Sequence, residues 1–201
     1  MTAQTLNHGH NGAHQGVNPK VVFGFWVFIL TDFILFAALF ATYSVLHNNT
    51  FGAMGIKEIT RLSYVMIQSL IFLTSSFTCG MAIVALRNEQ RSKVMAWLFV
   101  TFLLGLSFVG LEYKEFTGLI HAGATWHTSA FLSSFFTLVG LHACHVVVGL
   151  LWILILMLQL TMQGTTSTMM KTRLACLGLF WDFLNIIWVF IFSIVYLMGA
   201  I

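Results

Sequence analysis

Long apolar stretches alternate with short polar segments along most of the chain. Five of the stretches are long enough to cross a membrane, which takes roughly 20 helical residues. Backbone groups inside lipid must be hydrogen-bonded within their own segment, so each stretch is predicted to be an α-helix. We therefore expect an all-α integral membrane bundle that forms one domain over residues 21–201. Its five transmembrane helices are expected at residues 21–46, 63–86, 94–116, 129–160 and 174–199.

A polar segment, residues 1–20, precedes the first apolar stretch and contains His8, His10 and His14. We predict a flexible tail, with loose metal binding as the alternative. A signal peptide is not expected. The first stretch is longer than the usual apolar region of about 7–15 residues and has no small-residue cleavage site.

Basic residues are divided unevenly between the two sides of the predicted bundle. The tail and the segments after the second and fourth stretches hold six Lys or Arg residues, and the opposite side holds three. Cytoplasmic loops carry the excess of basic residues. We therefore expect a cytoplasmic N-terminus and a periplasmic C-terminus in a bacterial inner membrane.

Composition supports the membrane assignment. Hydrophobic residues make up 59% of the chain and charged residues only 7%, whereas a soluble domain averages about 25% charged residues. This excludes an ordinary soluble enzyme. The net charge of +3 is spread over several segments, so no nucleic-acid partner is expected.

Few polar residues that can ionise lie within the apolar stretches, and such residues usually mark function or an interface. Counting residues along each helix groups them by depth. One predicted cluster pairs Asp32 with Asp182 in the cytoplasmic half. The other lies near the outer face and contains Glu112, Glu115, His142 and His145.

Two interpretations of Asp32 remain open from the residues alone: a carboxyl that exchanges protons, or a structural acid bonded to a neighbouring helix. Asp182 and Asn185 are three residues apart and are expected to form a shared polar spot. His142 and His145 are one helical turn apart, so they cannot ligate one haem from opposite sides. We expect no catalytic residue, cofactor or metal ligand in this chain. Small residues, such as Gly80 and Gly149, are expected at close helix contacts.

Four motifs follow one another along the chain. They are Phe23–Asp32, Leu104–Phe116, Gly140–Gly149 with its Gly-x-His-x-x-His-Val pattern, and Phe180–Tyr196. In this order they resemble the motifs of the subunit III family of haem-copper oxidases, and the match runs from about Phe23 to the C-terminus. The five-helix length, the short histidine-bearing tail and the chain's ending are similar to the quinol oxidase branch, the bo-type (cytochrome o) ubiquinol oxidases.

The resemblance implies an accessory subunit of a respiratory, proton-pumping terminal oxidase that oxidises quinol and reduces oxygen to water. Such a subunit carries no redox centre, packs directly on subunit I within a complex that also contains subunits II and IV, holds phospholipid between its helices, and supports proton uptake and sustained turnover. Haem and copper are expected in subunit I. Asp32 matches the family's membrane-embedded acid, and the residues implied to serve protons or lipid are Asp32, Glu112, Glu115, His142, His145, Asp182 and Asn185.

One motif departs from the family pattern. The last helix of the family usually contains Trp-His-Phe-x-Asp, whereas this chain has Trp181, Asp182 and Phe183 followed by Leu184 and Asn185. A role that needs that histidine is therefore not expected here. Alternatives are a short-form cytochrome c oxidase subunit III, the related helper protein of nitric oxide reductase systems, and a small proton-coupled transporter. The repeats and broken helices typical of transporters are not evident.

Overall fold

The computed structural model describes residues 17–46, 62–123, 127, 129–163 and 168–197, and helices account for most of them. Five of these helices are long and apolar enough to cross a membrane, which confirms the predicted all-α membrane bundle. The part of the chain that the structure describes contains no strand. The helices are α1 (Pro19–Leu46), α3 (Leu62–Arg87), α4 (Arg91–His121), α5 (Ala130–Gln163) and α6 (Thr168–Ile191), and α6 continues as the π-helix η1 (Phe192–Leu197).

The first helix begins earlier than predicted, because Pro19 and Lys20 belong to α1 and not to the tail. The side-chain oxygen of Asn18 accepts a hydrogen bond from the backbone N–H of Lys20, at 3.2 Å. Asn is a preferred N-cap residue, and proline suits the first helical position because it has no N–H to leave unbonded. The predicted histidine site of the tail, at His8, His10 and His14, lies outside the described residues.

The third membrane helix is longer than predicted, because α4 runs from Arg91 to His121 and not from 94 to 116. The prediction that this helix ends at residue 116 was therefore wrong, and His121 belongs to the helix. The helix ends in a turn at Gly123, which has a φ of +83° and whose N–H donates to the carbonyl of Ile120. Glycine adopts this left-handed conformation without strain, which is why it commonly ends helices.

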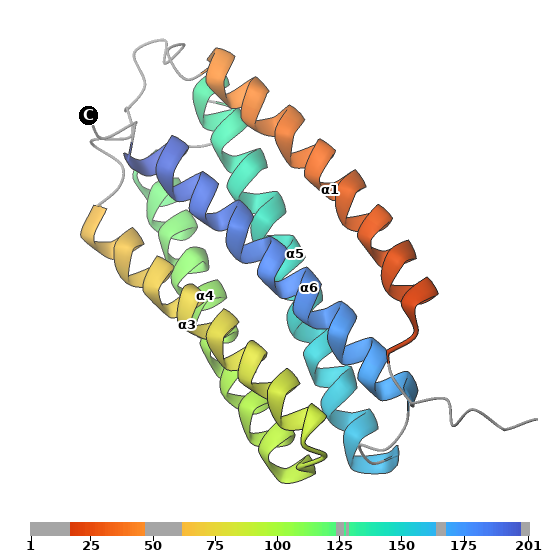
Figure 1. The fold of residues 1–201 in the computed structure, drawn as a ribbon. Helices are drawn as coiled ribbons and strands as arrows, with labels where there is room; N and C mark the ends of the chain where they lie inside the picture. Colours follow the sequence, from red (N-terminus) through yellow and green to blue (C-terminus); the bar gives the residue numbers. More distant parts are fainter. Residues whose placement is uncertain (1–16, 47–61, 124–126, 128, 164–167, 198–201) are drawn as a thin grey trace, which may run out of the picture.

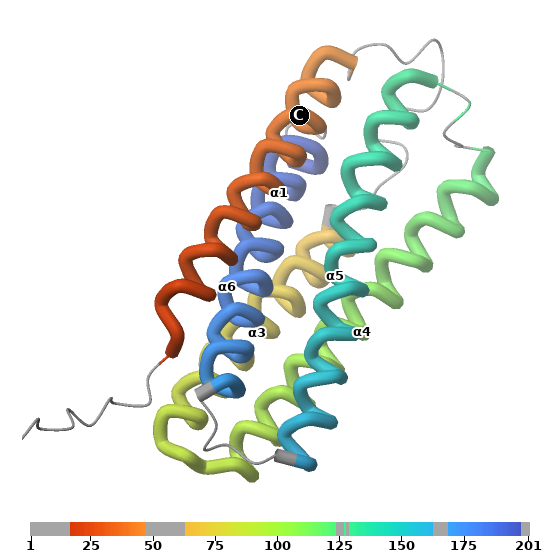
Figure 2. The backbone as a smooth tube through the Cα atoms, turned by 90° about the vertical axis from the view of Figure 1, so that its right-hand side faces the viewer, coloured from red at the N-terminus to blue at the C-terminus, as the bar shows by residue number. Residues whose placement is uncertain are grey.

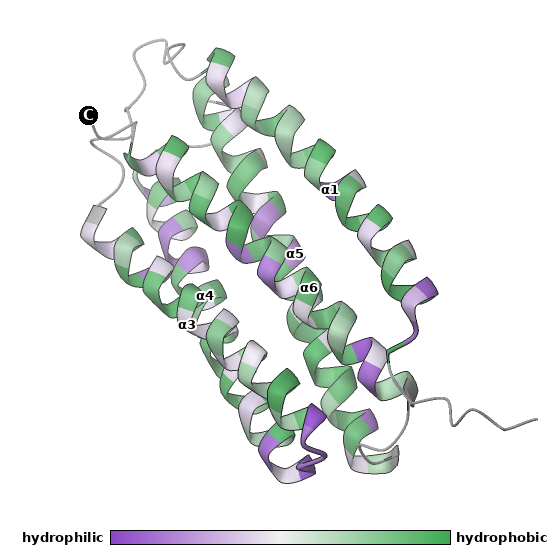
Figure 3. Cartoon of the chain, viewed as in Figure 1, coloured by the Kyte–Doolittle hydropathy of each residue, from purple (hydrophilic) through white to green (hydrophobic). Residues whose placement is uncertain are grey.

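Helix α6 occupies the centre of the bundle and packs against α1, α3 and α5, as the two perpendicular views show (Figures 1 and 2). Helices α3 and α4 form an antiparallel hairpin, and α5 packs between α4 and α1. We call the end of the bundle where α1 begins the N-end, and the end where η1 finishes the C-end. Hydrophilic residues gather towards the helix ends, with a few isolated patches midway along α4, α5 and α6 (Figure 3).

Layers of paired residues join α3 to α4. Gln68 donates a hydrogen bond to Glu112, and one turn further towards the N-end the rings of Phe72 and Phe108 stack with centroids 4.4 Å apart. Deeper still, the hydroxyls of Thr78 and Thr101 lie 2.8 Å apart. A polar pair thus closes each end of an aromatic layer, which fixes the depth of the two helices relative to each other.

Two glycines create a slot for the largest buried side chain of α6. A Cβ on Gly149 of α5 would lie 2.9 Å from the Trp181 ring, and one on Gly105 of α4 would lie 3.0 Å from it. Trp181 is fully buried. The predicted close contact at Gly149 is confirmed. The one predicted at Gly80 is wrong, because a Cβ there would meet nothing within 4 Å.

Candidate functional site

Asp32 of α1 lies beside His145 of α5. The Oδ2 of Asp32 is 3.9 Å from the Nε2 of His145, and the two side chains are 13% and 19% exposed. The predicted depth clusters put His145 with the two glutamates and Asp32 with Asp182. The grouping of His145 is wrong, because His145 lies against Asp32. Depth along a helix does not reveal which neighbouring helix a side chain faces, and the rotation of α1 directs Asp32 towards α5.

The tautomer of His145 determines what the pair can do. The Nδ1 of His145 lies 2.9 Å from the backbone carbonyl of Leu141. A carbonyl only accepts hydrogen bonds, so Nδ1 carries the hydrogen. The Nε2 of the neutral ring then faces Asp32 with a lone pair, and Asp32 Oδ2 has no hydrogen-bond partner among the described residues. The separation of 3.9 Å is longer than a hydrogen bond, so the two atoms face each other without one.

His142 has a different environment, although it is only one turn away. Its ring is fully buried and stacks on Trp188 of α6 with centroids 5.4 Å apart. The ring planes of Phe72 and Phe108 are both at 89° to the His142 ring, with centroids 5.8 and 6.1 Å from its centroid. Neither ring nitrogen has a hydrogen-bond partner in the described structure. His142 is therefore part of the aromatic core.

A second polar group lies towards the C-end, between α3, α4 and η1. Glu112 is 2% exposed, and its Oε2 accepts a hydrogen bond from Gln68 Nε2 at 3.1 Å. Glu115 follows one turn later, so it lies on the same face of α4. Tyr196 of η1 is 1% exposed. Sequence reasoning missed Gln68 because it considered only side chains that ionise.

Asp182 and Asn185 do not form the expected shared polar spot. The carboxyl of Asp182 is exposed on the bundle surface and accepts a hydrogen bond from Ser76 of α3. Asn185 is buried, and its side-chain amide donates to the carbonyl of Trp181, at 2.9 Å. The two residues therefore have separate partners, one on the surface and one within the core.

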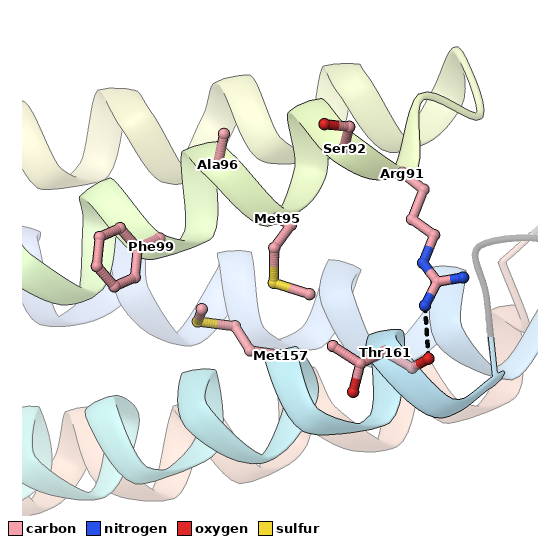
Figure 4. A pocket seen from close by; sticks show the side chains of 7 residues that line it. All are labelled: Arg91, Ser92, Met95, Ala96, Phe99, Met157 and Thr161. Atoms are coloured by element: carbon pink, nitrogen blue, oxygen red, sulfur yellow. Dashed lines mark hydrogen bonds between the residues drawn. The ribbon is translucent and has the colours of Figure 1, made fainter.

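An open groove of about 660 Å³ lies between α4 and α5 at the N-end. Figure 4 shows Arg91 at one end of it, with its guanidinium donating to the carbonyl of Thr161. The side chains of Met95, Phe99 and Met157 form the apolar part. The groove thus combines one cationic head with an apolar wall.

The described residues offer little for a metal or haem. Within residues 17–46, 62–123, 127, 129–163 and 168–197, no group of three or more His, Cys, Asp or Glu side chains is placed to hold a metal ion. His142 is enclosed by aromatic rings, and His145 uses one nitrogen on its own helix. These residues do not fit haem or copper ligation.

Comparison with known proteins agrees with this arrangement. The family model for cytochrome c oxidase subunit III matches residues 3–200. The chain is 48% identical to cytochrome bo(3) ubiquinol oxidase subunit 3 of Pseudomonas aeruginosa, over 99% of this chain and 94% of that protein. It is 42% identical to quinol oxidase subunit 3 of Bacillus subtilis, over 96% of both chains. It is 39% identical to cytochrome c oxidase subunit 3 of Bacillus sp. strain PS3, over 100% of this chain and 97% of that protein.

Proposed function

Since the chain belongs to the cytochrome c oxidase subunit III family, we propose that it is the accessory subunit III of a terminal quinol oxidase in a bacterial inner membrane. The observation that carries the choice of branch is that the relatives of highest identity among those compared are named for quinol oxidation. The identities are 48% and 42%, against 39% for the relative named for cytochrome c oxidation. The complex oxidises quinol and reduces oxygen to water.

The chain contributes to this reaction without touching the reacting atoms. Subunit I supplies the haem and copper that carry electrons to oxygen, and subunits II and IV complete the complex. Support for a non-catalytic role comes from His142 and His145, because the surroundings of both rings do not fit a haem or copper ligand.

The pair of Asp32 and His145 is the proposed proton-handling group. Its two facing atoms, Oδ2 and Nε2, are both acceptors in the neutral-histidine state. A proton taken up between them makes a charge-assisted hydrogen bond or ion pair. Both side chains keep a small exposed fraction, which leaves the pair open to protons from a partner subunit or from bound water. The pair thereby acts as a proton reservoir beside subunit I.

The groove at Arg91 is the proposed phospholipid site. A guanidinium binds phosphate through planar pairs of N–H donors, and only one of its nitrogens is hydrogen-bonded to Thr161. Met95, Phe99 and Met157 supply the apolar wall that an acyl chain needs. We assign this site to the cytoplasmic leaflet because the N-end carries the excess of basic residues, and the phosphate of an anionic lipid is abundant there.

The face of α3 and α6 that carries Asp182 is the proposed contact with subunit I. Asp182 lies 13 residues after Met169, the first residue of its span, or about 20 Å along the axis. A carboxyl exposed to lipid near mid-membrane is costly, and such residues almost always face protein or water. Ser76 supplies one donor, and a partner helix supplies the rest of the environment.

A pull-down of this chain in mild detergent tests the proposal. The product is examined by optical spectroscopy and by oxygen uptake with quinol and with reduced cytochrome c. A haem-bearing complex driven by quinol is expected. A complex driven only by reduced cytochrome c would retain the family and move the chain to the other branch. The pull-down is repeated after crosslinking in the membrane, which prevents loss of partners in detergent. Purification of the crosslinked chain without any haem protein would contradict the accessory role.

A further inference from the structure

Five buried oxygen atoms near the C-end have no hydrogen-bond partner in the described structure. They are Gln68 Oε1, Glu112 Oε1, both carboxyl oxygens of Glu115, and the hydroxyl of Tyr196. Gln68 and Tyr196 are at most 1% exposed. Buried polar atoms are normally bonded to protein or to ordered water. Five unbonded atoms in one place therefore point to bound material between α3, α4 and η1.

These atoms belong to one group. Gln68 donates to Glu112 and also lies near the carboxyl of Glu115. Tyr196 lies within electrostatic range of both carboxyls. The aromatic pair of Phe72 and Phe108 closes the group one turn below. The group therefore has an apolar floor, and its polar atoms face one another and not lipid.

The hydrogen-bond donors and acceptors in the group show what a bound species must supply. Amide and carboxylate oxygens only accept hydrogen bonds, and the single hydroxyl of Tyr196 is the one donor among the five atoms. One of the two N–H groups of the Gln68 amide is donated to Glu112, and the other has the nearby Glu115 carboxyl as an acceptor. The group therefore lacks donors, which excludes an anion or a lipid phosphate as its occupant. Water, a proton or a cation would supply what it lacks.

The charges around the group favour a proton. From the neighbouring helices, the titratable side chains near it are the phenols of Tyr43, Tyr64 and Tyr196 and the imidazole of His142, one turn below. Neither glutamate belongs to the ion pairs of Asp32 with His145 and of Glu89 with Lys171. The basic neighbour Lys114 is exposed. Two adjacent carboxylates without a cation repel each other strongly at low dielectric.

We propose that Gln68, Glu112, Glu115 and Tyr196 enclose a small water cluster in which Glu112 and Glu115 hold one proton between them. The shared proton removes one negative charge and provides the donor that the carboxyl oxygens lack. Glu115 is half-buried and lies six residues before the end of α4 at His121, about 9 Å along the axis. It is the entry point for water and protons from the C-end. The site is independent of the oxidase branch.

Infrared difference spectroscopy on the complete oxidase complex tests the site at neutral pH. Subtracting the spectrum of Glu112→Gln or Glu115→Gln from that of the wild type cancels the partner subunits. We expect each difference spectrum to contain a change in the carbonyl band of a protonated carboxyl, either its loss or a frequency shift as the remaining glutamate keeps the proton alone. This band should move to lower frequency in deuterated water. Glu115→Gln keeps the test usable if Glu112→Gln does not assemble, because Glu115 is less buried. Glu89→Gln, at the exposed pair with Lys171, serves as the control and should lack the band.

Two results would overturn the proposal. Ionised-carboxylate bands alone, with no loss or shift of a protonated-carboxyl band in either variant, would show that the two glutamates share no proton. Stoichiometric sodium or calcium retained by the wild-type complex and lost in Glu115→Gln would show that a metal cation, and not a proton, supplies the positive charge.

Discussion

The indole Nε1 of Trp181 donates a hydrogen bond to the hydroxyl of Ser75, 3.0 Å away, and this bond joins α6 to α3 inside the bundle. Seven residues later, the indole of Trp188 donates to Ser69 in the same way. The two tryptophans lie two turns apart on α6. They hold the central helix at a fixed depth against α3, and this depth also positions His142 and Tyr196, whose rings contact Trp188.

The slot around Trp181 provides the first prediction. In Gly149→Ala, the added Cβ meets the Trp181 ring at 2.9 Å. The ring is fully buried and hydrogen-bonded to Ser75, so it has little room to adjust. Overpacking of this kind typically costs about 1–3 kcal/mol. We expect a lower free energy of unfolding in mixed detergent and dodecyl sulfate micelles. Gly80→Ala is the matched control, because nothing lies within 4 Å of its Cβ. Equal stability of the two variants would contradict the tight slot.

Hydropathy was sufficient to predict the five helices, because lipid imposes both their length and their internal hydrogen bonding. The same reasoning located Asp32, Glu112 and His142, whose polarity is unusual in an apolar stretch. It did not predict that Asp32 contacts His145 and not Asp182, because residue counts give depth but not the rotation of a helix. Gln68 was missed because an uncharged side chain stands out less, although a glutamine inside a 24-residue apolar stretch was a usable signal.

Asp32→Asn is expected to permit assembly while slowing proton uptake or shortening the active lifetime of the oxidase. Asparagine keeps the size of the side chain, but an amide cannot take up a proton beside His145 Nε2. Oxygen consumption followed over many turnovers, together with proton uptake in vesicles, measures the effect. Glu89→Gln alters an exposed ion pair at the N-end and should behave as the wild type. An Asp32→Asn complex with normal uptake and lifetime would favour the purely structural interpretation of this acid.

Substitutions of His142 should change the stability of the protein without changing the haem spectrum of the complex. His142→Ala removes a ring that is stacked on Trp188 and flanked by Phe72 and Phe108. Aromatic-to-alanine changes in cores typically cost about 3–5 kcal/mol. His142→Phe keeps the ring and eliminates two unbonded nitrogens, so it should cost far less. The haem spectrum of the assembled complex should be unchanged in both variants. Loss of a haem band in His142→Phe would reveal a ligand role.

The groove at Arg91 predicts a change in bound lipid. Arg91→Gln removes the cation at one end of the groove, so the purified complex should retain less anionic phospholipid when measured by native mass spectrometry. Arg87→Gln is the matched control, because Arg87 ends α3 at the same end of the bundle and does not line the groove. Equal lipid loss in the two variants would indicate a general surface-charge effect and not a site.

Replacing Asp182 by leucine should have opposite effects on a lipid-facing and on a protein-facing surface. If the face of α3 and α6 lies in lipid, Asp182→Leu removes a charged group whose cost near mid-membrane is about 2.5–3.5 kcal/mol. The chain would then become more stable and would still co-purify with subunit I. If the face contacts subunit I, the substitution leaves the partner's donors unbonded inside the interface, and co-purification falls. We expect the second result, measured as the ratio of subunit I to this chain after purification.

Ile186→Leu, an apolar exchange one turn along the same exposed face, should leave that ratio unchanged, because it keeps the volume and introduces no polar group. Ser76→Ala should reproduce part of the loss, because Ser76 holds the carboxyl of Asp182 in place.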